Sequence, residues 1–341
     1  MKKIILEIKE LIYLKPILAV GIFSLIFFFL GGMAVFLLAK ANDVNISYKN
    51  KPERQKNLEY KFTSPLLDCN YEGGPFAIKA DSMKEKIEKI INENINNGKV
   101  KHVSVYFRDL NNGPTIGIAE KEMFTPASLL KVPLMMAYLK KAENNPAILK
   151  KKIVYALEQQ EENDIIQNIA PKETLKIGEK YEVEELIKRM IVYSDNEAAN
   201  LLLDVAANDF LANVYLDLGI EAPTLEKMEN FMTVKEYASF FRILYNSSYL
   251  NRTMSEKALG FLSEIRYKGG LRAGIPDDVM LAHKFGERVF ENIHQLHDCG
   301  IVYHDVSPYI LCLMSRGDNF GNLDDVIKDI SKNVYNEVDK E

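Results

Sequence analysis

The pattern of apolar and polar residues changes sharply after the first forty positions. Residues 17–39 contain no charged side chain and consist mainly of Ile, Leu, Phe, Val, Ala and Gly. Crossing a bilayer takes about 20 apolar residues, so this run predicts an N-terminal transmembrane helix, preceded by residues 1–16. A cleaved signal peptide is the alternative, because Ala39-Lys40-Ala41 is a small-x-small sequence. Lysines flank the run on both sides, so charge counting leaves its orientation open.

After this run the chain becomes polar and then takes up a helical pattern. Residues 40–75 have few periodic apolar positions, which predicts a stalk or linker. Residues 76–341 are expected to form the folded domain. Its first helix is predicted to begin at the capping box Ser82-Met83-Lys84-Glu85 and to stop at Gly98. The apolar face of that helix comprises Ile87, Ile90, Ile91 and Ile95.

Alternating apolar residues predict two groups of strands. Residues 103–107 and 116–118 alternate on either side of a turn at 111–114, which is typical of a hairpin. Strand character returns at 279–282, 300–303 and 309–314, and a turn at 305–308 joins the last two. Between 125 and 263 the pattern is helical, and we expect no strand there. The last helix has an inner face of Leu323, Val326, Ile327, Ile330 and Val334.

This order of elements predicts an α/β fold of the α+β kind. One antiparallel sheet is expected to be flanked by N- and C-terminal helices, with an all-helical lobe inserted between its strands. A length of 341 residues with 47% hydrophobic content is sufficient for one large domain.

Charge and cysteine content narrow the possible partners. The formal net charge of -5 gives no electrostatic support to nucleic-acid binding. Cys69, Cys299 and Cys312 are too few for a disulfide framework, and an odd number leaves at least one thiol free or paired between chains. Cysteine usage therefore does not fix the redox compartment.

The first candidate for chemistry is Ser128-Leu129-Leu130-Lys131. A serine is a poor nucleophile at neutral pH and needs a base within hydrogen-bond reach. Positions three apart share a helical face, so Lys131 is expected beside Ser128 at a helix N-terminus. That terminus supplies N–H groups and positive potential, which favour a neutral lysine and a developing oxyanion. Taken alone, the motif is better explained by an ordinary capped helix.

Two further motifs follow in the chain. Ser194-Asp195-Asn196 lies on a predicted turn between helices, where Ser194 could pass a proton and Asn196 could hold both a substrate carbonyl and Lys131. The alternative is a helix N-cap, for which these residue types are preferred. Lys284-Phe285-Gly286 closes an edge-strand pattern, where the cation could attract a carboxylate and the glycine could let substrate approach the backbone.

The three motifs in this order resemble the class A β-lactamase family. The likeness extends over residues 106–113, 124–128, 193–203 and 270–276, and covers the chain from about residue 82 onward. The resemblance implies that Ser128 forms an acyl-enzyme, Lys131 is a base or proton relay and Ser194 protonates the leaving group. It further implies that Asn196, Lys284 and Gly286 line the substrate site. The backbone N–H groups of Ser128 and Glu287 would form the oxyanion hole.

The sequence departs from the family at two positions. A class A enzyme uses a glutamate on a long loop to activate the water that releases the acyl group. Here the loop after Gly219 is short, and Glu226, four residues before Asn230, is a weak candidate whose alternative is a solvated surface residue. Phe285 replaces a hydroxyl residue, and losing a polar partner for a charged group weakens binding by about 1.5 to 3 kcal/mol. Both departures favour a poor β-lactamase or a different substrate.

A histidine-rich stretch raises the question of a metal. His294, His297, Cys299 and His304 fit no zinc spacing well, and strand alternation places His297 and Cys299 on the face opposite to His304. An ordinary hairpin is the simpler interpretation. We therefore expect no metal and no cofactor.

The resemblance implies a single-pass membrane protein with its N-terminus inside the cell and its catalytic domain outside. We expect a monomer whose ligand is a small-molecule β-lactam or a peptidoglycan stem peptide. A D-alanyl-D-alanine peptidase and a non-catalytic penicillin-binding sensor or wall-binding module remain alternatives, because they share the acylation residues.

Overall fold

The computed structural model describes residues 60–64, 76–111, 114–156, 171, 173–206, 208–222 and 229–340. The predicted membrane span at 17–39, Cys69 and Glu226 lie outside these residues. Within the described ranges, no helix is both long and apolar enough to cross a membrane.

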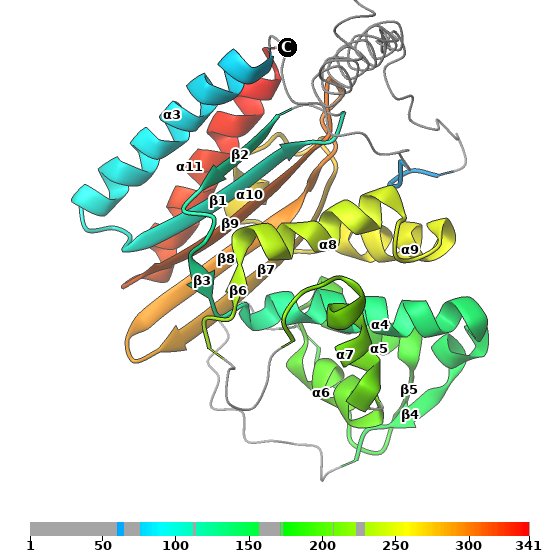
Figure 1. The fold of residues 1–341 in the computed structure, drawn as a ribbon. Helices are drawn as coiled ribbons and strands as arrows, with labels where there is room; N and C mark the ends of the chain where they lie inside the picture. The colour runs from blue at the N-terminus through cyan, green and yellow to red at the C-terminus, as the bar shows by residue number, and fades with distance from the viewer. Residues whose placement is uncertain are drawn as a thin grey trace, which may run out of the picture. The chain divides into compact units, whose positions relative to one another are not determined.

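A five-stranded sheet forms the centre of the described domain (Figure 1). Its order is β2-β1-β9-β8-β7, and every neighbouring pair is antiparallel. The strands are β1 (His102–Asp109), β2 (Thr115–Ile118), β7 (Leu281–Phe290), β8 (Ile293–Val302) and β9 (Tyr309–Gly317). The predicted hairpins, β1 with β2 and β8 with β9, are confirmed, and β7 lies at the sheet edge.

Both faces of the sheet are buried, which explains the continuous apolar run of β9. Tyr309, Leu311 and Leu313 belong to a core shared with α3 (Phe76–Asn96) and α11 (Phe320–Val338). The alternate residues Ile310, Cys312 and Met314 belong to a second core on the opposite face. Strands covered on both faces lose the polar alternation of a half-exposed strand.

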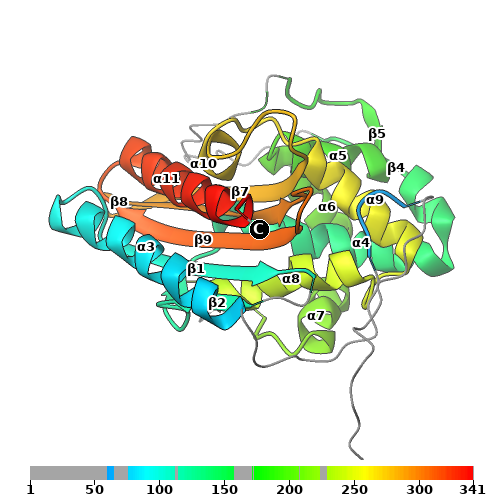
Figure 2. The ribbon, with the colours of Figure 1, turned by 90° about the horizontal axis from the view of Figure 1, so that it is seen from above.

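Helices cover the two faces as separate layers (Figures 1 and 2). The terminal helices α3 and α11 lie side by side on one face, together with the short helix α10 (Gly270–Ala273). The opposite face contacts α8 (Val234–Asn246) and α9 (Arg252–Ser263). The predicted α+β arrangement, a sheet between terminal helices and an inserted lobe, is therefore confirmed.

The inserted lobe is mostly helical. It contains α4 (Lys131–Asn144), η2 (Pro146–Lys150), α5 (Val183–Val192), α6 (Asn196–Val205) and α7 (Asn208–Asp217). The expectation of no strand between residues 125 and 263 was wrong. β3 (Met123–Phe124) pairs with β6 (Met232–Thr233), and β4 (Lys152–Val154) pairs with β5 (Lys180–Glu182). These strands have two or three residues each, which is too short for a period of two to be detectable.

The predicted start of the first helix was also wrong. α3 begins at Phe76, so Ser82 lies inside the helix instead of capping it. Its buried side chains include Ala80, Met83, Ile87 and Ile91. Packing of these side chains against α11 and the sheet extends the helix beyond its local capping signal.

A short segment within the predicted stalk contacts the domain. The backbone N–H groups of Lys61, Phe62 and Thr63 all donate to the carboxylate of Glu256 on α9. The Phe62 ring also meets Tyr303 edge-on, with centroids 5.7 Å apart. Residues 60–64 are thus held by one charged acceptor and one aromatic contact.

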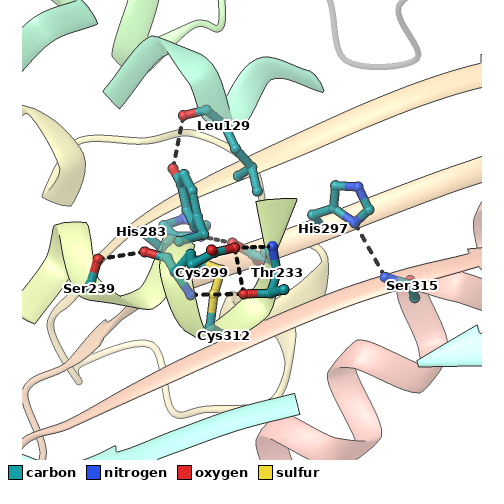
Figure 3. Close-up of a disulfide and its surroundings, with 11 residues drawn as sticks. Leu129, Thr233, Ser239, His283, His297, Cys299, Cys312 and Ser315 are labelled. Carbon is teal, nitrogen blue, oxygen red and sulfur yellow. Dashed lines mark hydrogen bonds and ion pairs between the residues drawn. A yellow bond between two sulfur atoms is a disulfide. The ribbon is translucent and has the colours of Figure 1, made fainter. Parts of the chain in front are cut away.

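Cys299 and Cys312 form a disulfide between the paired strands β8 and β9 (Figure 3). Both cysteines are fully buried, in the core shared with α8. The bond takes Cys299 out of the set of possible zinc ligands. It also shows that two of the three cysteines pair within the chain, an outcome that cysteine counting did not anticipate.

Candidate active site

Ser128 lies on a tight turn at the start of the lobe. The 3₁₀ turn η1 (Ala127–Leu130) runs directly into α4 at Lys131, so Ser128 and Lys131 share one face as expected from their spacing. Ala127, just before the serine, has a left-handed backbone with φ of 52°. Such a conformation is disfavoured for alanine and persists only when surrounding contacts hold it. Ser128 itself is partly exposed.

The edge strand β7 holds this turn through close packing at Gly286. A Cβ atom at Gly286 would lie 2.7 Å from the Pro126 carbonyl oxygen and 3.1 Å from the Leu129 nitrogen. Only glycine permits backbone approach at this distance without movement of one partner. From α8, the Tyr237 hydroxyl donates to the Leu129 carbonyl at 3.0 Å. The strand and the helix thus fix the turn from two sides.

Lys131 is buried and makes three hydrogen bonds to the Ser194-Asp195-Asn196 turn. Its Nζ donates to the Ser194 carbonyl oxygen at 2.6 Å and to Asn196 Oδ1 at 2.6 Å. A third contact, at 3.2 Å, reaches the Ser194 hydroxyl. These bonds fix the amine between the turn that carries Ser128 and the turn that carries Ser194.

The Ser194 turn combines an unusual backbone with a helix cap. Ser194 is buried and has φ of 54°, and it joins α5 to α6. Asp195 is the N-cap of α6 and accepts from the Ala198 N–H at 3.1 Å. The cap therefore falls on Asp195. Ser194 and Asn196 are left to bind Lys131.

Two lysines converge on one hydroxyl. Lys284 Nζ on β7 donates to Ser194 Oγ at 3.0 Å, on the same oxygen that Lys131 contacts. Burial lowers the pKa of Lys131 to about 7, although the charges of Asp195 and Glu287 raise it in part. Burial and then the Lys131 charge lower the pKa of Lys284. The neutral fraction of a lysine with a pKa near 7 can accept a proton from a serine hydroxyl.

Lys284 is enclosed on its remaining sides. Its Nζ donates to the Phe285 carbonyl at 2.9 Å and lies 4.1 Å from the centroid of the Phe285 ring. The Phe285 ring is buried and stacks against Tyr267, with centroids 4.5 Å apart. Because Lys284 has no exposed surface, its ammonium acts on Ser194 and not on solvent.

Comparison with known proteins identifies the family. The model of the beta-lactamase enzyme family matches residues 82–338, which is most of the chain. The chain belongs to the beta-lactamase enzyme family. None of the curated proteins matches it.

Solved structures of the β-lactamase family share this fold. A mutant of PBP-A, solved as an acyl-enzyme complex with penicillin G, is 18% identical with a TM-score of 0.65 and covers 76% of this chain and 97% of its own. The TLA-3 extended-spectrum beta-lactamase is 21% identical with a TM-score of 0.66, covering 75% and 98%. A beta-lactamase from Chitinophaga pinensis DSM 2588 is 20% identical with a TM-score of 0.65, again covering 75% and 98%. At these identities the likeness establishes the fold alone.

The structure gives fewer contacts for the remaining predicted residues of this β-lactamase-family site. Glu287 follows Gly286 on β7 and is partly buried, so its backbone runs beside the Ser128 turn. Glu226 lies outside the described residues, but Asn230 after it is exposed and its N–H donates to Thr125 Oγ1 at 3.0 Å. No metal-binding group of three His, Cys, Asp or Glu residues occurs among the residues with described positions.

His297 holds the segment before Ser128, a role that sequence reasoning missed. Its Nε2 contacts the Thr125 carbonyl oxygen at 3.0 Å, and its Nδ1 accepts from the Ser315 N–H at 3.2 Å (Figure 3). These partners require a neutral ring protonated on Nε2. Burial lowers the pKa of His297 to about 4. The sequence offered no signal for this contact, because Thr125 lies 172 residues away.

Proposed function

We propose that this chain is an extracytoplasmic serine hydrolase of the class A β-lactamase type, acylated on Ser128 by a β-lactam or a related amide. The observation that carries the proposal is the convergence of Lys131 and Lys284 on the Ser194 hydroxyl, beside the turn that presents Ser128. A structural salt bridge would not explain it, because neither lysine has a carboxylate partner within ion-pair distance among the described residues.

The reaction begins with attack of Ser128 Oγ on the carbonyl carbon of the substrate. Its proton passes to the neutral amine of Lys131. The backbone N–H groups of Ser128 and Glu287 stabilise the negative charge on the carbonyl oxygen. When the carbon–nitrogen bond breaks, the Ser194 hydroxyl gives its proton to the leaving nitrogen and is reprotonated by the lysines that contact it. The product is an ester on Ser128.

Release of the ester needs a water molecule and a base. Glu226 is the candidate for this base. Asn230, four residues later, donates its N–H to Thr125 in the segment that leads to Ser128. The neighbouring Glu229 is held by Arg288 of β7, with N and O atoms 2.7 Å apart. Substitution Glu226→Gln is expected to lengthen the lifetime of the penicillin ester if Glu226 is the base.

A D-alanyl-D-alanine peptidase is the second candidate. Its acylation steps are the same, and it needs no dedicated glutamate to release the acyl group. Release of D-alanine from a stem peptide, with slow hydrolysis of penicillin, would support the peptidase. Fast penicillin hydrolysis without release of D-alanine would support the β-lactamase.

Location outside the cytoplasm is part of the proposal. The apolar residues 17–39 are proposed to anchor the chain in the cell membrane with the catalytic domain outside. The buried Cys299–Cys312 disulfide agrees with an oxidising compartment, because disulfides are rare in the cytosol. Protease digestion of intact and lysed cells tests the orientation: digestion of the domain only after lysis would contradict it.

Acylation is tested with a labelled penicillin. The full-length protein is expected to carry the label, and Ser128→Ala is expected to lose it. Ser263→Ala is the matched control, because Ser263 ends α9 and its hydroxyl donates to the Gly260 carbonyl, with no contact to the site. Equal labelling of wild type and Ser128→Ala would contradict the proposal.

A further inference from the structure

The cation expected to bind a substrate carboxylate is not accessible in this chain. Lys284 is fully buried, and it is enclosed by the Ser194 hydroxyl, the Phe285 carbonyl and the Phe285 ring. Lys131 is likewise buried, with three acceptors around its amine. Phe285 itself offers no hydroxyl. An anionic substrate therefore needs a different positive group beside the site.

Arg266 supplies such a group between the Ser194 turn and strand β7. Its guanidinium lies over the ring of Tyr193, with Cζ 5.1 Å from the ring centroid, and Tyr193 is bonded directly to Ser194. The next residue, Tyr267, stacks on Phe285 of β7. The Arg266–Tyr267 pair thus contacts the Ser194 turn on one side and the β7 strand on the other.

The loop that carries Arg266 is fixed by two carboxylates, of which Asp298 is buried and Asp324 is partly buried. The Tyr267 hydroxyl and the Gly270 N–H both donate to Asp324 of α11, the latter at 2.7 Å. The Leu271 N–H donates to Asp298 of β8 at 2.9 Å. A fixed loop places the guanidinium without further ordering of the backbone, which reduces the entropy lost on binding.

Arg266 is exposed, and its charge is available. Its guanidinium makes a cation–π contact with the Tyr193 ring and no ion pair among the described residues, whereas Arg288 on β7 is paired with Glu229 at 2.7 Å. A guanidinium presents a planar fork of N–H donors that matches a carboxylate, and stacking on an aromatic ring leaves the edge of that fork open. The geometry supports a carboxylate ligand better than a neutral one.

We infer that Arg266, stacked on Tyr193, binds the carboxylate of the substrate in place of the enclosed Lys284. This inference rests on the proposed acylation of Ser128 and adds the residue that selects for anionic substrates. Arg266 contacts the substrate away from the scissile bond, so it determines specificity and does not take part in proton transfer.

The test compares penicillin G with its methyl ester, which has the same lactam but no carboxylate. The second-order rate of acylation is expected to be about 10- to 100-fold higher for the acid in the wild type, the range given by a charge-assisted hydrogen bond. Arg266→Gln is expected to lower the rate of acylation by the acid by that factor and to leave the rate for the ester unchanged. Arg266→Lys keeps the charge without the planar fork, so its rate of acylation by the acid is expected to lie between those of the wild type and Arg266→Gln.

Lys268→Gln is the matched control, since Lys268 is an exposed cation two residues later in the same loop. It is expected to leave the ratio of acid to ester unchanged. A wild-type ratio near one, or an equal loss for acid and ester in Arg266→Gln, would overturn the inference and leave acylation intact. Failure of both compounds to acylate Ser128 would overturn the proposed function together with it.

Discussion

At the scale of single residues, the proposed acylation of Ser128 depends on the protonation state of Lys131. Its burial lowers the pKa to about 7, so a substantial neutral fraction exists at physiological pH. Asn196 and the Ser194 carbonyl hold the amine at 2.6 Å each, which orients it without adding a carboxylate that would keep it charged. Lys131 is therefore suited to be a base at neutral pH.

Removal of this amine should abolish the activation of Ser128. Lys131→Met keeps a chain of similar length and removes a buried charge, so the fold should be retained. Acylation by a labelled penicillin is expected to slow by about 10²- to 10⁴-fold, the usual contribution of a positioned base. The melting temperature is the control for folding. Acylation at the wild-type rate in a folded Lys131→Met protein would exclude Lys131 as the base.

At Phe285 the sequence shows the loss of a hydroxyl group, but it does not show where the ring packs. The missing hydroxyl was evident from the Lys284-Phe285-Gly286 motif. The Phe285 ring packs against Tyr267 and lies over the Lys284 ammonium. This arrangement was not predictable, because Tyr267 lies 18 residues earlier in the chain.

At the scale of elements, the contact between β7 and the η1 turn sets the geometry of the site. Gly286 is the closest point of this contact. A Cβ atom at this position would lie 2.7 Å from the Pro126 carbonyl oxygen and 3.1 Å from the Leu129 nitrogen. Because backbone atoms cannot swing away as a side chain can, any substitution must separate the strand from the turn.

Gly286→Ala is expected to impair acylation more than stability. Separating the turn from the strand moves the N–H groups of Ser128 and Glu287 apart, and a displacement of about 1 Å can slow a reaction about 100-fold. Overpacking is expected to lower the free energy of unfolding by about 1 to 3 kcal/mol. Gly260→Ala in α9 is the control, since its Cβ would meet only Phe62, at 3.7 Å. Normal acylation by Gly286→Ala would show that the contact is not required.

His297 links β8 and β9 to the segment before Ser128, and it makes stability depend on pH. The pKa of His297 is lowered to about 4 from 6.5, so between these values the unfolded chain binds a proton that the folded protein does not. Stability should therefore fall as the pH drops from about 6.5 to 4, by about 3 kcal/mol from this residue.

His297→Gln removes this titration and can still donate to the Thr125 carbonyl. Its free energy of unfolding, measured with urea from pH 4 to 7, should fall less than that of the wild type. His297→Asn, which cannot reach Thr125, should also slow acylation. Parallel pH profiles for wild type and His297→Gln would contradict the assignment of a neutral His297.

The sheet was more predictable than the element boundaries. β9 was evident because Tyr309 to Met314 are apolar on both faces, and the β8–β9 hairpin followed from its turn. β7 extends to Phe290, beyond the predicted 279–282, because its last residues are exposed and lack apolar alternation. The pairing of β3 with β6 joins residues more than 100 positions apart, which no local pattern can indicate.

At the scale of the whole molecule, the folded domain includes a segment that sequence patterns assigned to the stalk. Residues 60–64 bind across α9 through the Glu256 carboxylate, which accepts three backbone N–H groups. Arg252 of the same helix stacks on Tyr60 at 4.1 Å and donates to Thr63 Oγ1. Residues 60–64 of the predicted stalk are thus attached to the folded domain.

Glu256→Gln should weaken this attachment, because an amide nitrogen cannot accept a hydrogen bond. Hydrogen bonds to charged groups contribute about 1.5 to 3 kcal/mol, so the free energy of unfolding is expected to fall by about 1 to 2 kcal/mol. Proteolysis near residue 60 should become faster while penicillin acylation is unchanged. Glu264→Gln is the control, because Glu264 caps the end of the same helix and pairs, among the described residues, with Lys188 alone. Equal proteolysis of the two variants would contradict the role of Glu256.

The motifs predicted the candidate site residues Ser128, Lys131, Ser194, Asn196 and Lys284 from residue type and spacing. The supporting contacts of His297, Tyr237 and Arg266 could not be found in this way. They arise from strand register and helix packing across distant parts of the chain.

The most direct test of the account is the rate at which Ser128 itself is acylated as a function of pH. The full-length protein is mixed with penicillin G, quenched at short times and digested, and the modified peptide is identified by mass spectrometry. The account predicts a single adduct on Ser128, whose rate of formation rises as the pH passes through about 7, where Lys131 becomes neutral. An adduct on another residue, or a rate that does not change between about pH 5.5 and 8.5, would contradict it.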